Sequence, residues 1–272
     1  MQSQTSRLSR RFQIFSALRH RNFRLFWLNG ATQAMAQGMQ FLILGWLVLD
    51  ITGSSYQLGL VIFAFGLPNI PFALLGGVIA DRANRLKLLI LTRICVSTLI
   101  FALAILRFSD LLDIWHVYAV VFLLGTIQGL NMPARQAIVA DLVERDNMMN
   151  AVALHTLVNQ TGQIIGPAAA GGIIELVGIG PTLLVNAGLY LSGIGFLVFI
   201  TELPRRSATK GVTLLVELGA GLQCVRSTPI LLTVIGMTLA FAFFALSFRQ
   251  VMPAIAQEVL EIGAGGTGLL LL

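Results

Sequence analysis

Long apolar stretches, joined by short polar turns, make up most of this sequence beyond residue 24. Each stretch is about 20 residues long, which is the length that an α-helix needs to cross a bilayer. Seven stretches are complete, and an eighth begins near Gly263 and is still apolar at Leu272. The pattern predicts membrane-spanning helices over 25–49, 56–80, 88–106, 115–132, 151–177, 181–200 and 230–248.

The composition agrees with lipid as the main solvent. Of the 272 residues, 56% are hydrophobic and 11% are charged, and the mean hydropathy is +0.84. A soluble domain has about 25% charged residues, so this chain has too few to cover a surface that faces water. The sequence therefore predicts an all-α, polytopic membrane protein.

Lys and Arg are distributed unevenly between the two ends of the predicted spans. If the N-terminus lies inside, all of the 18 Lys and Arg residues except Arg107 and Arg249 fall on the inner side. Basic loops stay in the cytoplasm, so we expect a multi-pass protein of the cell (inner) membrane with a cytoplasmic N-terminus. In this interpretation Arg93 lies at the inner start of the third span and Arg135 in the loop after the fourth. The same loops account for the pI of about 10.1, so no nucleic-acid partner is expected.

The spacing of the spans predicts four regions. A basic N-terminal arm covers 1–24, a six-helix transmembrane domain 25–200, a cytoplasmic linker 201–229, and the incomplete start of a second transmembrane domain 230–272. Six helices, a linker and a new set of helices are typical of transporters built from two six-helix halves. The chain stops inside an apolar run, so we expect it to be truncated and to lack the second half.

A charged turn between the second and third predicted spans is the first candidate site. Its residues are Gly77, Asp81, Arg82, Asn84, Arg85 and Lys87. A carboxylate at the end of a span can pair with an arginine or with the positive end of another helix. The turn is either a gate that holds two halves in one state or a solvated loop. Asp141 and Glu144 follow the fourth span on the same face, and we expect Arg85 to pair with one of them.

Residues 77–85, Gly-Val-Ile-Ala-Asp-Arg-Ala-Asn-Arg, resemble the signature between the second and third helices of the major facilitator superfamily. The family pattern is Gly-x-Leu-Ala-Asp-Arg-x-Gly-Arg-Lys, from which this sequence departs at Ile79, Asn84 and Leu86. Segments 131–137, 150–151 and 166–171 are similar to the multidrug and siderophore efflux branch, which includes enterobactin exporters. The resemblance implies the six-helix N-terminal half of a major facilitator fold, with a seventh helix and the start of an eighth.

The resemblance further implies secondary active export of drug-like or siderophore-like molecules by alternating access, driven by proton antiport. Many proton-coupled members carry an arginine three residues before a Gln-Gly pair on the fourth helix, and here that position is Gly125. Two other interpretations are a metabolite or sugar importer and a truncated, non-transporting membrane scaffold or remnant. No phosphate-binding loop, catalytic constellation or metal-ligand spacing is present in the sequence, so we expect neither an enzyme nor a cofactor.

Amide side chains recur at helical spacing within three of the predicted spans. Amides that faced lipid would lack hydrogen-bond partners, so these should face protein or a water-filled cavity. We predict a substrate cavity, with hydrogen bonding between helices as the alternative. The predicted lining residues are Asn29, Gln33, Gln37, Gln40, Gln128, Asn131, Asn159 and Gln163. His155 lies on the same stripe as Asn159, and we expect it to be structural.

The fifth predicted span contains small residues and a proline, namely Gly162, Gly166, Pro167 and Gly171. Small residues let helices pack closely and proline bends a helix, so this span should form a tight and bent helix contact. Acidic residues inside a membrane mark ion coupling. The candidates are Asp50 and Glu175, near the outer ends of the first and fifth spans.

Overall fold

The computed structural model describes residues 21–143, 147–200, 226–241, 252–256, 260 and 262–271. Every regular element in this part of the chain is a helix. The helices are α2 (Arg21–Thr52), α3 (Ser55–Arg82), α4 (Arg85–Phe108), α5 (Ile114–Leu142), α6 (Met148–Val177), α7 (Ile179–Val198), α9 (Pro229–Phe241) and α11 (Ala264–Leu270). The prediction of an all-α protein is therefore confirmed.

Helices α2 to α5 and α7 are long and apolar enough to cross a membrane. Helix α6 has 30 residues and packs among them. One predicted end is wrong: the fourth span does not stop at residue 132, because α5 continues through Pro133 to Leu142. The predicted arm and linker fall mostly on 1–20 and 201–225, which lie outside the described residues.

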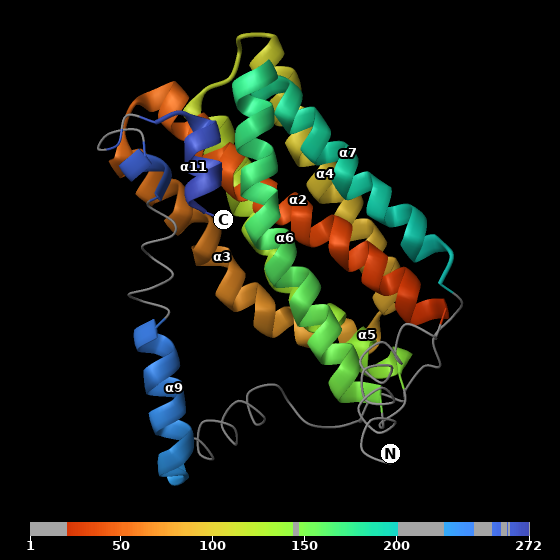
Figure 1. The fold of residues 1–272 in the computed structure, drawn as a ribbon. Coiled ribbons are helices and arrows are strands. Elements are labelled where there is room, and N and C mark those ends of the chain that lie inside the picture. The colour runs from red at the N-terminus through yellow and green to blue at the C-terminus, as the bar shows by residue number, and fades with distance from the viewer. Residues whose placement is uncertain are drawn as a thin grey trace, which may run out of the picture.

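Helix α2 lies at the centre of the bundle. It packs against α6 and α7 and also contacts α3 and α5, while α3 lies along α5 and α4 along α7 (Figure 1). Helix α3 contributes many exposed apolar side chains, including Phe63, Leu67 and Ile70. Large apolar side chains on the outside of a bundle suit contact with lipid. The helix arrangement thus separates a lipid-facing surface from an interior formed around α2.

The interior contains two apolar clusters with a polar layer between them. The first cluster includes Met39 and Leu42 of α2, and the second includes Phe23 and Phe26 of the same helix. Between them α2 carries Asn29 and Gln33, which are 1% and 4% exposed. The other buried polar side chains at this level are Thr92, Arg93, Asn131 and Arg135. A polar layer in the middle of a membrane bundle is costly unless its groups bind one another or a ligand.

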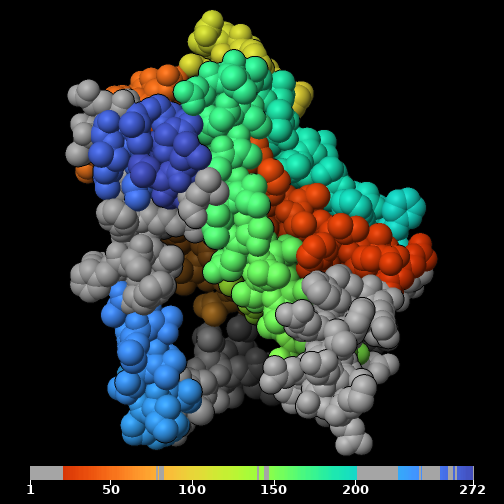
Figure 2. Space-filling model, viewed as in Figure 1, coloured from red at the N-terminus to blue at the C-terminus, as the bar shows by residue number. Residues whose placement is uncertain are grey.

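The glycines of the fifth predicted span form close helix contacts. A Cβ atom at Gly162 would lie 2.5 Å from the Cβ of Ala34, and one at Gly38 would lie 2.6 Å from the Gly162 carbonyl oxygen. Helices α2 and α6 therefore touch backbone to backbone. Farther along α6, Gly171 packs against Ala264 of α11, and Figures 1 and 2 show α11 lying against this helix.

Candidate functional site

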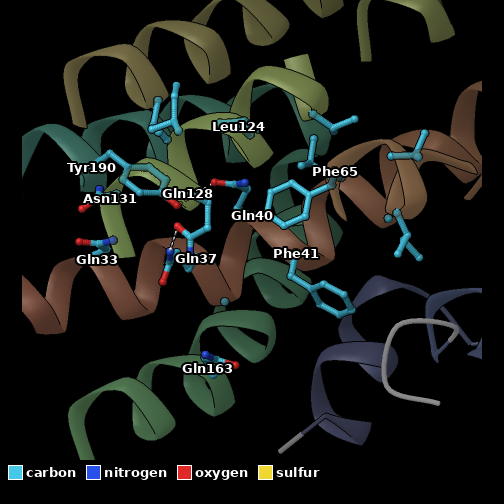
Figure 3. A pocket seen from close by; sticks show the side chains of 18 of the residues that line it. Gln33, Gln37, Gln40, Phe41, Phe65, Leu124, Gln128, Asn131, Gln163 and Tyr190 are labelled. Carbon is cyan, nitrogen blue, oxygen red and sulfur yellow. Dashed lines mark hydrogen bonds between the residues drawn. The ribbon is translucent and has the colours of Figure 1, made fainter. Parts of the chain in front are cut away.

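A cavity of about 350 Å³ lies in the bundle beside α2. One part of its wall is apolar and includes Phe41, Phe65 and Leu124. The other part is polar and includes Gln33, Arg93 and Tyr190. Figure 3 shows Gln33, Asn131 and Tyr190 toward one end and Phe41 and Phe65 toward the other. The cavity is therefore amphipathic, with its polar end at the level of the buried polar layer.

Six of the eight amides named from the sequence line this cavity. They are Gln33, Gln37, Gln40, Gln128, Asn131 and Gln163. The other two do not line it. Asn29 is buried, and its side-chain oxygen has no hydrogen-bond partner among the described residues. The Asn159 amide donates to the His155 carbonyl oxygen of its own helix at 2.8 Å. Whether the six residues bind a substrate stays a prediction.

Hydrogen bonds between helices hold several of these amides in place. Gln37 Nε2 of α2 donates to Gln128 Oε1 of α5 at 2.9 Å (Figure 3). Tyr190 Oη of α7 donates to Gln40 Oε1 at 2.7 Å. The two interpretations of the amide stripes, cavity lining and helix pairing, therefore apply to the same side chains. These hydrogen bonds hold the amides in the space between the helices. A ligand there could take the place of one of the two bonded side chains.

Arg93 of α4 is the most important residue that the sequence prediction misplaced. It was counted as a charge at the inner end of a span, but it is 2% exposed and lines the cavity. Its Nη2 donates to the Asn29 carbonyl oxygen at 2.9 Å and to Gln33 Oε1 at 2.7 Å. Its Nη1 donates to the Tyr190 carbonyl oxygen at 3.5 Å. Five uncharged residues, 88–92, separate Arg93 from Lys87, and this spacing was the signal in the sequence that Arg93 lies within the helix.

Arg135 was also assigned to a loop, and this assignment is wrong. It lies within α5 and is 9% exposed. Its Nε and Nη2 atoms have no hydrogen-bond partner in the described part of the chain. Arg135 is close enough to Arg93 and His155 to act on both electrostatically. His155 itself stacks on the Phe26 ring with centroids 5.8 Å apart.

The charged turn is only partly described. Arg85 at the start of α4 forms an ion pair with Asp141 near the end of α5, which is one of the two pairings expected. The Asn84 side chain caps α4 by accepting from the Lys87 backbone N–H at 3.2 Å. A Cβ atom at Gly77 would meet nothing within 4 Å. The side chains of Asp81 and Arg82, and all of Glu144, lie outside the described residues.

The two acidic residues proposed for ion coupling lie away from the cavity wall. Asp50 pairs with Arg107 at 2.7 Å, with side chains that are 40% and 38% exposed. Glu175 is exposed, and its carboxylate lies against Gly265 of α11. The first contact joins the ends of α2 and α4, and the second joins α6 and α11. A coupling role for either residue stays a prediction.

We expect Asp141→Asn to destabilise the bundle more than Asp50→Asn. The Asp141 side chain is 8% exposed, whereas that of Asp50 is 40% exposed. Removing one charge of a shielded pair leaves its partner poorly solvated, and about 1–3 kcal/mol is a reasonable loss for a partly buried pair. Exposed pairs contribute about 0.2–1 kcal/mol. Thermal unfolding of the two purified variants measures the difference, and equal midpoints would contradict it.

An amphipathic cavity within a bundle of bilayer-length helices is typical of multi-pass membrane transporters. The family model described as transmembrane secretion effector, of the major facilitator superfamily, matches residues 13–272, so the chain belongs to this family of transporters. The predicted superfamily is thereby confirmed.

Three relatives illustrate the similarity. The chain is 24% identical over 188 residues to the MFS-type transporter YfiS of Bacillus subtilis, covering 68% of this chain and 44% of YfiS. It is 31% identical over 153 residues to the staphyloferrin A transporter of Staphylococcus aureus, covering 54% and 37%. It is 29% identical over 163 residues to the enterobactin exporter EntS of Citrobacter koseri, covering 57% and 35%. The matched region spans less than half the length of each relative.

Proposed function

We propose that this chain forms the N-terminal part of a secondary transporter that exports small organic molecules, siderophore-like or drug-like, by alternating access and proton antiport. The observation that carries the proposal is the amide-lined, amphipathic cavity beside α2. The names of two relatives, a staphyloferrin A transporter and an enterobactin exporter, support a siderophore-like substrate. The proposal includes a cytoplasmic N-terminus and a second six-helix half that completes the transport path.

The cavity supports transport because its polar groups can bind a solute without a fixed covalent or metal site. Gln37 and Gln128 already bind each other across the space between α2 and α5. A substrate with donors and acceptors could replace that hydrogen bond at little net cost, since one hydrogen bond is exchanged for another. The apolar wall around Phe41 and Phe65 suits the carbon skeleton of the same molecule.

The ion pair between Arg85 and Asp141 supports a gate at one end of this path. It ties the start of α4 to the end of α5 beside the charged turn. A contact of this kind stabilises the state in which the two helix ends are together. In the proposed mechanism the charged turn opens and closes one side of the cavity as the halves rock against each other.

Proton coupling in this proposal does not use the fourth-helix arginine of many family members. The matching residue is Gly125, and a Cβ atom there would overlap the backbone carbonyl of Phe65 in α3. Proton antiport therefore rests on the family resemblance, and the coupling group is a separate question. Asp50 and Glu175 remain the acidic candidates.

An efflux assay on the full-length gene product tests the proposal. We expect cells that make the protein to lose a loaded siderophore faster than cells with an empty vector, because the cavity binds the solute and the halves alternate. An uncoupler should abolish the difference by dissipating the proton gradient. Efflux that persists with the uncoupler would disprove proton antiport, and faster accumulation than in the control cells would favour the importer.

A pair of cavity variants sharpens the same assay. Gln37→Leu removes an amide that lines the cavity, whereas Asn159→Leu removes one that does not line it. Efflux should fall several-fold in Gln37→Leu and stay close to the unmodified rate in Asn159→Leu. Equal efflux by the two variants would argue against this cavity as the substrate path.

A further inference from the structure

The polar end of the cavity carries the buried positive charge of Arg93, which has no negative partner among the residues that the structure describes. We infer that the cavity takes an amphipathic anion, with a carboxylate or phenolate group bound at Arg93 and an apolar body against Phe41 and Phe65. This inference rests on the proposed transport function and names its substrate class. A cation deep in a membrane bundle is costly, and such residues mark substrate or ion paths.

The hydrogen-bond partners of Arg93 in the described part of the chain are all neutral. Its three hydrogen bonds go to the carbonyl oxygens of Asn29 and Tyr190 and to the amide oxygen of Gln33. An arginine has five N–H donors, so donors remain for a ligand. Neutral acceptors orient the guanidinium but do not cancel its charge. Both Nη2–H groups are used in these hydrogen bonds, so the donors that remain are Nε–H and one Nη1–H. A carboxylate or phenolate oxygen could accept one charge-assisted hydrogen bond from either of them.

The acidic residues with described side chains either have contacts elsewhere or, in the case of Asp110, are exposed in the turn after α4. Asp141 pairs with Arg85, and Asp50 pairs with Arg107. Asp113 caps the start of α5, and Glu175 lies against α11. None of the acidic residues with described side chains lines the cavity. An anion that reached the polar end of the cavity would therefore meet positive charge and no described carboxylate.

Arg135 strengthens the positive potential at this end. It acts electrostatically on Arg93, and its Nε and Nη2 atoms have no hydrogen-bond partner among the described residues. Two nearby cations repel each other strongly where the surroundings are apolar. Arg135 itself does not line the cavity, but an anion bound at Arg93 would weaken this repulsion. The electrostatics of the polar end therefore favour an anionic ligand.

The remaining wall sets the shape of that ligand. Gln33 and Tyr190 lie toward one end of the cavity and Phe41 and Phe65 toward the other (Figure 3). The Arg93 guanidinium is at the first end, because it bonds Gln33 and Tyr190. A ligand that fits both ends carries its negative group at one side of an apolar or aromatic skeleton. The volume of about 350 Å³ suits a drug-sized molecule.

Two dyes with the same ring skeleton and opposite charge test the inference. Fluorescein is anionic at neutral pH, and rhodamine 123 is cationic. Binding to the purified full-length protein is measured by fluorescence anisotropy, and transport is measured separately in vesicles. We expect fluorescein to bind more tightly than rhodamine 123. Arg93→Gln should weaken fluorescein binding about tenfold to hundredfold, the usual effect of losing a charged hydrogen bond.

Two further variants serve as controls. Arg93→Lys keeps the positive charge but lacks the planar guanidinium group, so it should retain part of the fluorescein affinity. Arg24→Gln removes an exposed arginine outside the cavity and should have no effect on binding. If Arg93→Gln fails to fold, the preference of the unmodified protein and the Arg93→Lys variant still decide the question.

The outcomes separate the two proposals. Equal fluorescein binding by the unmodified protein and Arg93→Gln, or tighter binding of rhodamine 123, would overturn the anion site. Rhodamine 123 transport without fluorescein binding would overturn the anion site and leave the transport function standing. Fluorescein binding that depends on Arg93 but is not followed by movement across the vesicle membrane would support the anion site and overturn the transport function.

Discussion

Replacing Gly125 with alanine should destabilise the bundle more than the other glycine-to-alanine substitutions discussed below. The added Cβ would overlap the Phe65 carbonyl oxygen and lie 2.9 Å from the Phe65 carbonyl carbon. Both atoms belong to the backbone of α3, so no side-chain rotation can relieve the overlap. Overpacking of this kind costs about 1–3 kcal/mol and occasionally more.

The neighbouring contacts prevent α3 from moving away cheaply. A Cβ atom at Gly129 would lie 2.5 Å from the Asn69 carbonyl oxygen, and one at Gly76 would lie 2.8 Å from the Leu130 Cα atom. Asn69 Nδ2 also donates to the Gly125 carbonyl oxygen at 3.4 Å. Separation of α3 from α5 at Gly125 would therefore loosen a contact that extends over several helical turns.

Thermal unfolding of the purified protein measures this effect. Gly66→Ala in α3 is the matched control, because a Cβ atom there would meet nothing within 4 Å. Alanine favours a helix by about 1 kcal/mol over glycine, so the control should be neutral or slightly stabilising. A Gly125→Ala variant as stable as the Gly66→Ala variant would contradict the packing of α3 on α5. Gly125→Arg, which restores the family residue, should be destabilised further because the same Cβ comes with a long side chain.

Replacing Gly193 with alanine should displace the Arg93 guanidinium and lower anion binding about tenfold. The Cβ atom would overlap Arg93 Nη1 and lie 2.7 Å from Thr32 Oγ1. These atoms end side chains, so the structure can adjust by moving Arg93 rather than a helix. The guanidinium would then lose its alignment with Gln33 and Tyr190, because those acceptors belong to α2 and α7.

Fluorescein binding and thermal unfolding together check this expectation. Gly188→Ala on α7 is the control, since a Cβ atom there would meet nothing within 4 Å. If Gly193 acts through Arg93, the effect of Gly193→Ala on binding should largely disappear when Arg93→Gln is already present. Independent and additive effects of the two substitutions would show that Gly193 does not position Arg93.

The comparison of sequence with structure is most instructive at the polar residues. Gln33, Gln37 and Gln40 follow one helical stripe, so their common face could be predicted from spacing alone. Arg93 and Arg135 could not be placed in this way. A basic residue near the end of a span counts as a loop charge under the positive-inside rule. The fourth span was predicted to end at residue 132, but α5 continues through Pro133 to Leu142.

Apolar runs of about 20 residues and sparse charge were enough to predict a helical membrane protein, because runs of this length cross a bilayer as helices, whose backbone hydrogen bonds stay within the segment. The sequence also determined which amides share a helix face. Only the tertiary structure decided that Gly125 leaves no room for the family arginine and that Gly193 makes room for Arg93. These are contacts between helices far apart in the sequence, and helical spacing within one segment carries no information about how closely a neighbouring helix approaches. Arg93 is held at the cavity by acceptors on α2 and α7, two helices whose position beside α4 could not be predicted from the sequence of α4.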